Sequence, residues 1–203
     1  MSRQKSIFVL LLSLVCAYTF SWLTFSNDKV FWYFYSFTTL FLMSVAFYFA
    51  KLNDNLKTSR YIILGITFGV LTYALFAIGY KVIDITSLVS TKSATSFVNK
   101  FGPVSIWHYL MLLLIIAPGE ELFWRGFIQQ QLKKWLPPVY SIIVSAALFG
   151  FSFIFSGFWL GIFVAFILGL IFGVLYEWKK SMPLLILAHI TLFFLLFSVF
   201  PFN

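Results

Sequence analysis

Three ionisable residues stand close together within an otherwise apolar stretch: Glu120, Glu121 and Arg125. Ionisable side chains at membrane depth are costly, and they usually face the interior of a helix bundle or a water-filled cavity. Glu121 and Arg125 are four residues apart, so on a helix they share a face and can pair. Glu120 is five residues from Arg125, about 140° around an ideal helix, and therefore points elsewhere. The spacing predicts a structural ion pair between Glu121 and Arg125 and a less compensated carboxylate at Glu120.

Two interpretations of this cluster remain open. In the first, the residues form a buried ion pair whose only role is to lock helices together. In the second, Glu120 serves chemistry, because two carboxylates against one guanidinium leave a charge unaccounted for. Pro118 and Gly119 just before the carboxylates can kink or loosen the helix and free backbone groups beside them.

A further candidate is His189, which lies inside the last apolar stretch of the chain. A histidine among lipid-facing side chains would be expensive, so His189 should face inward, and we expect a hydrogen bond between it and Glu120. It could be a metal ligand or a proton carrier, or it could only bond to a neighbouring helix. His108 lies between Trp107 and Tyr109 and is expected in the aromatic belt at the outer interface, outside the site.

The composition indicates a membrane protein. The chain of 203 residues is 62% hydrophobic and 10% charged, with a mean hydropathy of +0.98, and these values are typical of polytopic membrane proteins. A formal net charge of +8 would favour nucleic-acid binding in a soluble protein, but here the basic residues lie in short segments between apolar stretches. We therefore expect membrane lipid as a partner and no nucleic acid. The single cysteine, Cys16, excludes a disulfide within the chain.

The hydropathy pattern predicts an all-α fold, a polytopic bundle of about seven transmembrane helices. The expected spans are residues 7–25, 30–50, 61–80, 104–132, 139–155, 158–176 and 183–200. The fourth is longer than the ~20 residues that a bilayer requires, so we expect it to be tilted, kinked or projecting from the membrane. The polar segment 81–103 is expected to be an external loop with room for a short surface helix.

Lysine and arginine residues concentrate in alternate connecting segments. With the N-terminus inside, every inner segment has at least two of them, whereas the turn after the fifth span and the C-terminus have none. The positive-inside rule therefore predicts an N-terminus inside and a C-terminus outside. Because the charged and small-residue features cluster late in the chain, we divide it into 1–103, with three helices and the external loop, and a core of 104–203.

The motifs of this core resemble the CPBP family of intramembrane proteases, which includes the CAAX-processing endopeptidases and bacterial, Abi-like proteins linked to bacteriocin self-immunity. The resemblance covers about residues 105–200 and rests on the Glu-Glu-x-x-x-Arg-Gly stretch, a following helix that contains Phe149, and Pro-Leu-Leu-Ile-Leu-Ala-His at 183–189. It implies a membrane helix bundle whose catalytic set consists of Glu120, Glu121, Arg125 and His189. In that set Glu120 would activate a water, and Glu121 and Arg125 would have structural roles.

The chain departs from the family pattern at two positions. The family's active site needs a histidine four residues after the motif phenylalanine and Asn or Asp four residues after the last histidine, and here these places hold Phe153 and Phe193. A catalytic zinc uses about three protein ligands and an open position. We therefore expect no cofactor and no metal, with Glu120 and His189 as weak candidate ligands, and zinc only if the protein is active.

The sequence thus predicts a CPBP-family protein integral to a membrane, and we expect the bacterial cell membrane. It would be a divergent or non-catalytic member, a pseudoprotease, that binds a membrane peptide or a partner protein in an immunity or envelope-scaffolding role. The first alternative is an active intramembrane endopeptidase that cuts near the C-terminus of a membrane-bound or lipidated peptide, with Glu120 as general base. The second alternative is a small transporter or lipid-binding protein, although the chain shows no internal repeat and no second broken helix.

Overall fold

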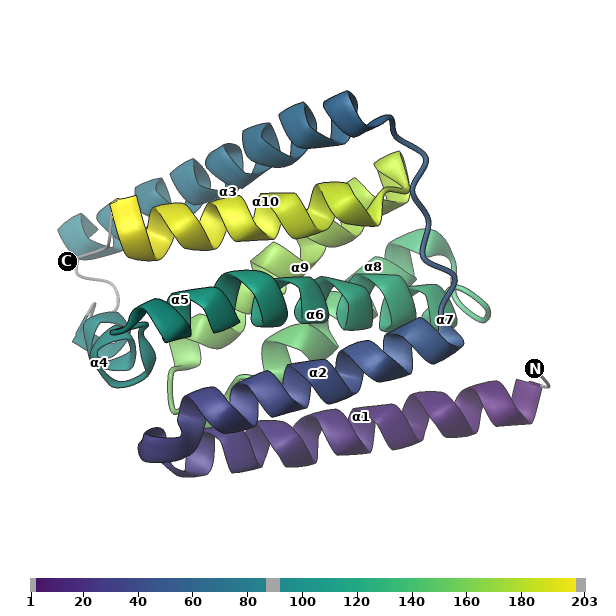
Figure 1. The fold of residues 1–203 in the computed structure, drawn as a ribbon, viewed down its shortest axis with the longest axis horizontal. Coiled ribbons are helices and arrows are strands. Elements are labelled where there is room, and N and C mark those ends of the chain that lie inside the picture. Colours follow the sequence, from purple (N-terminus) through teal and green to yellow (C-terminus); the bar gives the residue numbers. More distant parts are fainter. Residues whose placement is uncertain (1–2, 87–91, 200–203) are drawn as a thin grey trace.

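The computed structural model describes residues 3–86 and 92–199, and the regular elements of these residues are helices (Figure 1). The first part contains α1 (Arg3–Ser26), the 3-10 turn η1 (Asp28–Val30), α2 (Phe31–Phe49), α3 (Thr58–Thr86) and α4 (Lys92–Phe101). A broken helix follows, made of α5 (Ile106–Met111), η2 (Leu112–Ile116), α6 (Ala117–Glu121), η3 (Leu122–Gln129) and α7 (Gln130–Leu132). The last part contains α8 (Pro138–Phe151), η4 (Ile154–Ser156), α9 (Trp159–Lys179), α10 (Met182–Phe194) and η5 (Leu195–Val199).

Six helical stretches of the described chain are long and apolar enough to cross a membrane, and a seventh apolar helix is shorter. The six are Gln4–Ser26, Asp28–Phe49, Thr58–Thr86, Ile106–Leu132, Pro138–Ser156 and Trp159–Lys179, and the shorter one is Met182–Ser198. Each overlaps one of the predicted spans. The prediction of an all-α, polytopic helix bundle is therefore confirmed.

The segment 81–103 differs from the expected external loop. Helix α3 continues past the apolar run to Thr86, because a helix can extend beyond the bilayer when its last turns carry polar residues such as Lys81 and Asp84. Helix α4 then takes the place of the expected short surface helix. Only residues 87–91 of the segment lie outside the described part of the chain.

The α4 helix is anchored by aromatic side chains. Phe101 packs on Phe31 and Phe25, with ring centroids 4.6 and 5.5 Å apart, and Phe25 also contacts Phe153 at 6.0 Å. Phe97 of α4 stacks on Phe158 at the start of α9, at 4.8 Å. These contacts tie α4 to the end of α1, the start of α2 and the connection between α8 and α9.

The fourth span is irregular, in line with its length. Leu112–Ile116 and Leu122–Gln129 are π-helical, and they flank the short α6 helix that contains Pro118. Proline has no backbone N–H and therefore removes one i→i−4 hydrogen bond from the ladder. Wider turns of this kind occur mostly as single bulges within α-helices and frequently at functional sites. The irregular helix carries both carboxylates and Arg125 through the centre of the bundle.

Small residues set two of the closest helix contacts. A Cβ added at Gly69 of α3 would lie 2.7 Å from the backbone oxygen of Ala188 in α10, and one added at Gly169 of α9 would lie 2.8 Å from the Cα of Ala146 in α8. In each case the backbone of the neighbouring helix lies too close to leave room for a Cβ on the glycine, as small residues allow in membrane bundles. Figure 1 shows α10 running alongside α3, although 95 residues separate the end of α3 from the start of α10 in sequence.

The basic connecting segments meet at one end of the bundle. Glu177 pairs with Lys133 and with Lys180, and Lys134 Nζ lies 3.5 Å from Oγ of Ser6 near the start of α1. The segment after α2 joins the same end, because its Asp54 accepts a hydrogen bond from Ser181 at 2.7 Å. This arrangement agrees with the expectation that these segments share a face. The assignment of that face to the inside stays a prediction.

Candidate functional site

The structure brings Glu121, Arg125 and His189 together in one buried network. Oε1 of Glu121 accepts a hydrogen bond from Nη1 of Arg125 at 3.1 Å and lies 2.7 Å from Nδ1 of His189. The three side chains are at most 1% exposed. The pairing of Glu121 with Arg125 follows the predicted i, i+4 geometry, and the bond to His189 joins the broken fourth span to α10.

Two aromatic rings enclose the guanidinium of Arg125. Its Cζ lies 4.6 Å from the ring centre of Phe149 in α8 and 5.7 Å from that of Phe172 in α9. An arginine above an aromatic face is attracted by the ring quadrupole, and the attraction increases when both groups are away from water. The motif phenylalanine of α8 therefore contacts the predicted ion pair directly.

Glu120 is held by a residue that the sequence did not indicate. The hydroxyl of Tyr35 in α2 donates a hydrogen bond to Oε1 of Glu120. Oε2 of Glu120 lies 3.8 Å from Nε2 of His189, which is too far for a hydrogen bond. The expected bond between Glu120 and His189 is therefore absent, because His189 turns its Nδ1 to Glu121 instead.

A glycine allows Tyr35 to reach the carboxylate. A Cβ at Gly119 would lie 3.1 Å from both Cβ and the backbone oxygen of Thr39, so α2 passes directly over the residue before Glu120. Thr39 is one helical turn after Tyr35, on the same face of α2. A larger residue at position 119 would push α2 away from the site.

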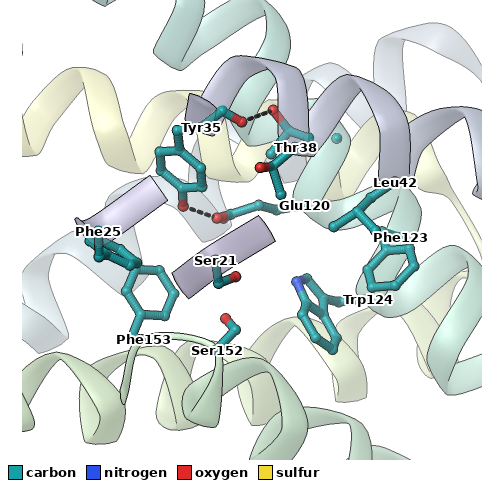
Figure 2. Close-up of a pocket in the computed structure, with 12 residues that line it drawn as sticks. Ser21, Phe25, Tyr35, Thr38, Leu42, Glu120, Phe123, Trp124, Ser152 and Phe153 are labelled. Atoms are coloured by element: carbon teal, nitrogen blue, oxygen red, sulfur yellow. Dashed lines mark hydrogen bonds between the residues drawn. The ribbon is translucent and has the colours of Figure 1, made fainter. Parts of the chain in front are cut away.

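A small cavity lies beside Glu120 (Figure 2). It offers about 20 Å³ of room for the centre of a water molecule, and about 10–15 Å³ of such room suffices for one water. Its polar lining consists of Ser21, Tyr35, Thr38, Thr39, Glu120 and Ser152. Four of these six residues come from α1 and α2, outside the predicted core of 104–203.

Three buried atoms of the polar centre have no hydrogen-bond partner among the described residues: Oε2 of Glu121, Nη2 of Arg125 and Nε2 of His189. Buried polar atoms in native proteins are nearly always paired. An ion pair that only locked helices together would be more stable if these three atoms had hydrogen-bond partners. The purely structural interpretation therefore explains this network incompletely.

Phe193 and Phe153 both reach the site. The ring of Phe193 lies 4.2 Å from the ring of His189, and Phe153 lines the cavity beside Glu120. Neither side chain offers a lone pair to a metal. The described residues contain no group of three or more His, Cys, Asp and Glu side chains that could hold a metal ion.

A catalytic zinc uses about three protein ligands, whereas Glu120 and His189 supply two. The residues present therefore do not fit a catalytic zinc. The absence of a resident cofactor stays a prediction, with Glu120 and His189 as the weak candidate ligands.

His108 lies apart from the polar centre. Its ring stacks on that of Trp32 with centroids 4.5 Å apart and an interplanar angle of 6°. Its Nδ1 accepts a hydrogen bond from the backbone N–H of Val104 at 3.3 Å. These contacts join α5 to α2, and they give His108 a packing role.

A family model described as type II CAAX prenyl endopeptidase Rce1-like matches residues 102–195 of the chain. The matched part contains the broken fourth span, α8, α9 and α10, and therefore Glu120, Glu121, Arg125 and His189. This match confirms the resemblance to CPBP-family proteases that the motifs indicated. No curated protein and no solved structure matches the chain.

Proposed function

We propose that this chain, whose residues 102–195 match the model of type II CAAX prenyl endopeptidase Rce1-like proteins, is a divergent, non-catalytic member of that family in a membrane. In this proposal it binds a membrane-embedded peptide or a partner protein at its polar centre. We place it in a bacterial cell membrane, with immunity to a membrane peptide or scaffolding of an envelope protein as its role. The membership of bacteriocin self-immunity proteins in the family supports this choice of role.

The observation that carries the proposal is the contact between Phe193 and His189. The two rings are 4.2 Å apart, and Phe193 stands where the family's active members place Asn or Asp. Nδ1 of His189 is hydrogen-bonded to Oε1 of Glu121. His189 is thus engaged on one side and covered by an apolar ring on another, which supports a site that has lost its catalytic set.

The unpaired atoms of the network support a binding role. Oε2 of Glu121 and Nη2 of Arg125 are buried without partners among the described residues. A polar centre that is only partly satisfied costs stability. Proteins retain such centres where a ligand, a partner or a reaction makes use of them. A partner that reached the centre with polar groups would stabilise it.

A peptidase assay tests the proposal. The purified protein would be reconstituted in liposomes with prenylated peptides that end in a CAAX sequence, with and without added zinc, beside a Glu120→Gln variant. We expect the same background cleavage in both proteins and in both conditions. Cleavage that depends on Glu120 would overturn the non-catalytic proposal.

The alternative is an active endopeptidase with Glu120 as general base, and one observation favours it. The carboxylate of Glu120 borders a cavity with room for about one water-sized group. A general base needs the proton that it abstracts within hydrogen-bond reach. Under this alternative the assay would show Glu120-dependent cleavage without added zinc.

A further inference from the structure

Two lysines from different helices meet at one carboxylate, at the end of the bundle where the basic segments gather. Lys133 directly follows the fourth apolar stretch, and Lys180 directly follows the stretch formed by α9. Both ammonium groups pair with Oε1 of Glu177, and the side chains of Lys133 and Lys180 remain 24% and 28% exposed. Two positive charges thus share one negative charge. This Lys–Glu–Lys cluster therefore has surplus positive charge at the depth where lipid headgroups lie.

The backbone of Lys180 indicates that its side chain has a use. Lys180 ends α9 in the left-handed conformation, with φ 49° and ψ 45°, and among the described residues other than glycine it alone has a positive φ. Glycine occupies this position at the end of a helix with less strain, and asparagine also tolerates it. A partly exposed pair with Glu177 contributes little stability by itself. A lysine in this strained position is therefore better explained by a ligand for its ammonium group.

An apolar strip on α9 leads to the Lys–Glu–Lys cluster. Four side chains, each at least 41% exposed, form this strip: Phe163, Ile167, Val174 and Trp178. They lie within about 60° of one another around an ideal helix, so they make one line along the outer face of α9. At the end of the line, Nζ of Lys179 lies 3.3 Å from the ring centre of Trp178. Tryptophan is enriched at the membrane–water interface, so the strip ends at headgroup depth beside a third ammonium group.

The strip and the cluster together match the two parts of a phospholipid. An acyl chain can lie along the apolar strip, and phosphate oxygens accept charge-assisted hydrogen bonds from ammonium groups. A zwitterionic lipid brings a cation of its own, which the surplus positive charge of the cluster would repel. A headgroup with a net negative charge meets no such repulsion, and basic pockets between membrane helices bind headgroups of this kind. A free phosphate would use the lysines but would gain nothing from the strip.

We infer that Lys133, Lys179 and Lys180, together with the strip on α9, form a binding site for one anionic phospholipid. Glu177 holds Lys133 and Lys180 beside each other and leaves them surplus positive charge for the phosphate. The bound lipid would join the end of the broken fourth span to the end of α9. Its binding does not depend on whether the polar centre of the bundle is catalytic.

Native mass spectrometry of the purified full chain, titrated with phospholipid in a neutral detergent, tests this inference. The dissociation constant of the first bound lipid is measured for phosphatidylglycerol and for phosphatidylcholine with the same acyl chains. We expect phosphatidylglycerol to bind about fivefold more tightly, the effect of about one lysine at a membrane surface. Inorganic phosphate in large excess should not displace it. Equal affinity for the two lipids would overturn the inference, and displacement by phosphate would show a site for free anions instead.

Lys180→Asn and Lys57→Asn serve as a matched pair. Both remove one positive charge, but Lys57 is an exposed residue of the segment between α2 and α3. Lys180→Asn should weaken phosphatidylglycerol binding about fivefold, whereas Lys57→Asn should leave it unchanged. Lys180→Gly should weaken binding equally without lowering the melting temperature in detergent, because glycine relieves the left-handed backbone. An equal effect of Lys57→Asn and Lys180→Asn, or unchanged lipid affinity in Lys180→Gly, would refute the site.

Discussion

Nη1 of Arg125 lies 3.1 Å from Oε1 of Glu121, one helical turn earlier, with both side chains buried. The carboxylate also meets His189, and the guanidinium faces the rings of Phe149 and Phe172. Neither charge has access to water that could replace its partner. Each therefore depends on the other for its place inside the bundle, and this dependence leads to the first prediction.

Arg125→Ala should destabilise the protein more than Glu120→Ala. Loss of one partner from a buried ion pair leaves an uncompensated charge and typically costs ~3–5 kcal/mol. Loss of Glu120 leaves only the hydroxyl of Tyr35 without its acceptor, for which a cost of ~1–3 kcal/mol is typical. Thermal unfolding of the purified variants in detergent, together with their folded yield, measures the difference. Equal melting and equal yield of the two variants would count against this assignment.

Tyr35→Phe should remove the hydrogen bond to Glu120 while keeping the ring of Tyr35 in its aromatic contacts with Phe25 and Phe31. A hydrogen bond to a charged group contributes ~1.5–3 kcal/mol. The cost of Tyr35→Phe should fall in a Glu120→Gln background, because a neutral amide oxygen accepts the hydroxyl of Tyr35 more weakly than a carboxylate does. A double-mutant cycle of unfolding free energies measures this coupling. Strictly additive costs would show that the contact between them contributes nothing.

The dependence of Glu120 on Tyr35 also marks the limit of what the sequence predicts. The pairing of Glu121 with Arg125 is local, so the period of the helix was sufficient to predict it. The inward orientation of His189 followed from the cost of a polar ring in lipid. Tyr35 stands 85 residues before Glu120 in an apolar helix without charged residues, where its hydroxyl gives no periodic signal.

The arrangement of the helices was likewise only partly predictable. Hydropathy located the spans because each must bury about the same thickness of apolar chain. It does not say which spans are neighbours. The packing of α3 on α10 depends on Gly69 meeting Ala188 across the fold, and glycines in other spans look alike in sequence.

Gly69→Ala should weaken the contact between α3 and α10. The added Cβ would lie 2.7 Å from the backbone oxygen of Ala188, and backbone cannot move aside as a flexible side chain can. Overpacking of this kind typically costs ~1–3 kcal/mol. Gly79→Ala, on the same helix, is the matched control, because nothing lies within 4 Å of its added Cβ. In thermal unfolding, the melting temperature of Gly69→Ala should lie below that of the wild type, and that of Gly79→Ala should equal or exceed it.

The predicted orientation can be tested with single cysteines in a Cys16→Ser background. Lys133 lies at the end of the bundle where the basic segments meet, and Lys92 begins α4 after the third span. The positive-inside rule places the first position in the cytoplasm and the second outside. A membrane-impermeant maleimide applied to intact cells should label Lys92→Cys and not Lys133→Cys. Labelling of both positions from the same side would refute the seven-span topology.

The last prediction concerns zinc at the two phenylalanine positions. Phe153 lines the cavity beside Glu120 and Phe193 contacts His189, so each phenylalanine lies next to one of the two candidate ligands. The double change Phe153→His and Phe193→Asn would add a nitrogen ligand and a polar neighbour to the two donors now present. A third protein ligand is what a catalytic zinc site requires.

We therefore expect less than stoichiometric zinc in the natural protein and measurable zinc binding in the double variant. Elemental analysis after dialysis against a defined free zinc concentration, followed by calorimetric titration, measures both. Phe153→Leu with Phe193→Leu is the control, because it removes the rings without adding donors. Stoichiometric zinc in the natural protein that is lost on His189→Ala would contradict the two-donor description. That result would also favour a role for Glu120 as a metal-assisted general base, because a metal held by His189 would lie next to the carboxylate of Glu120.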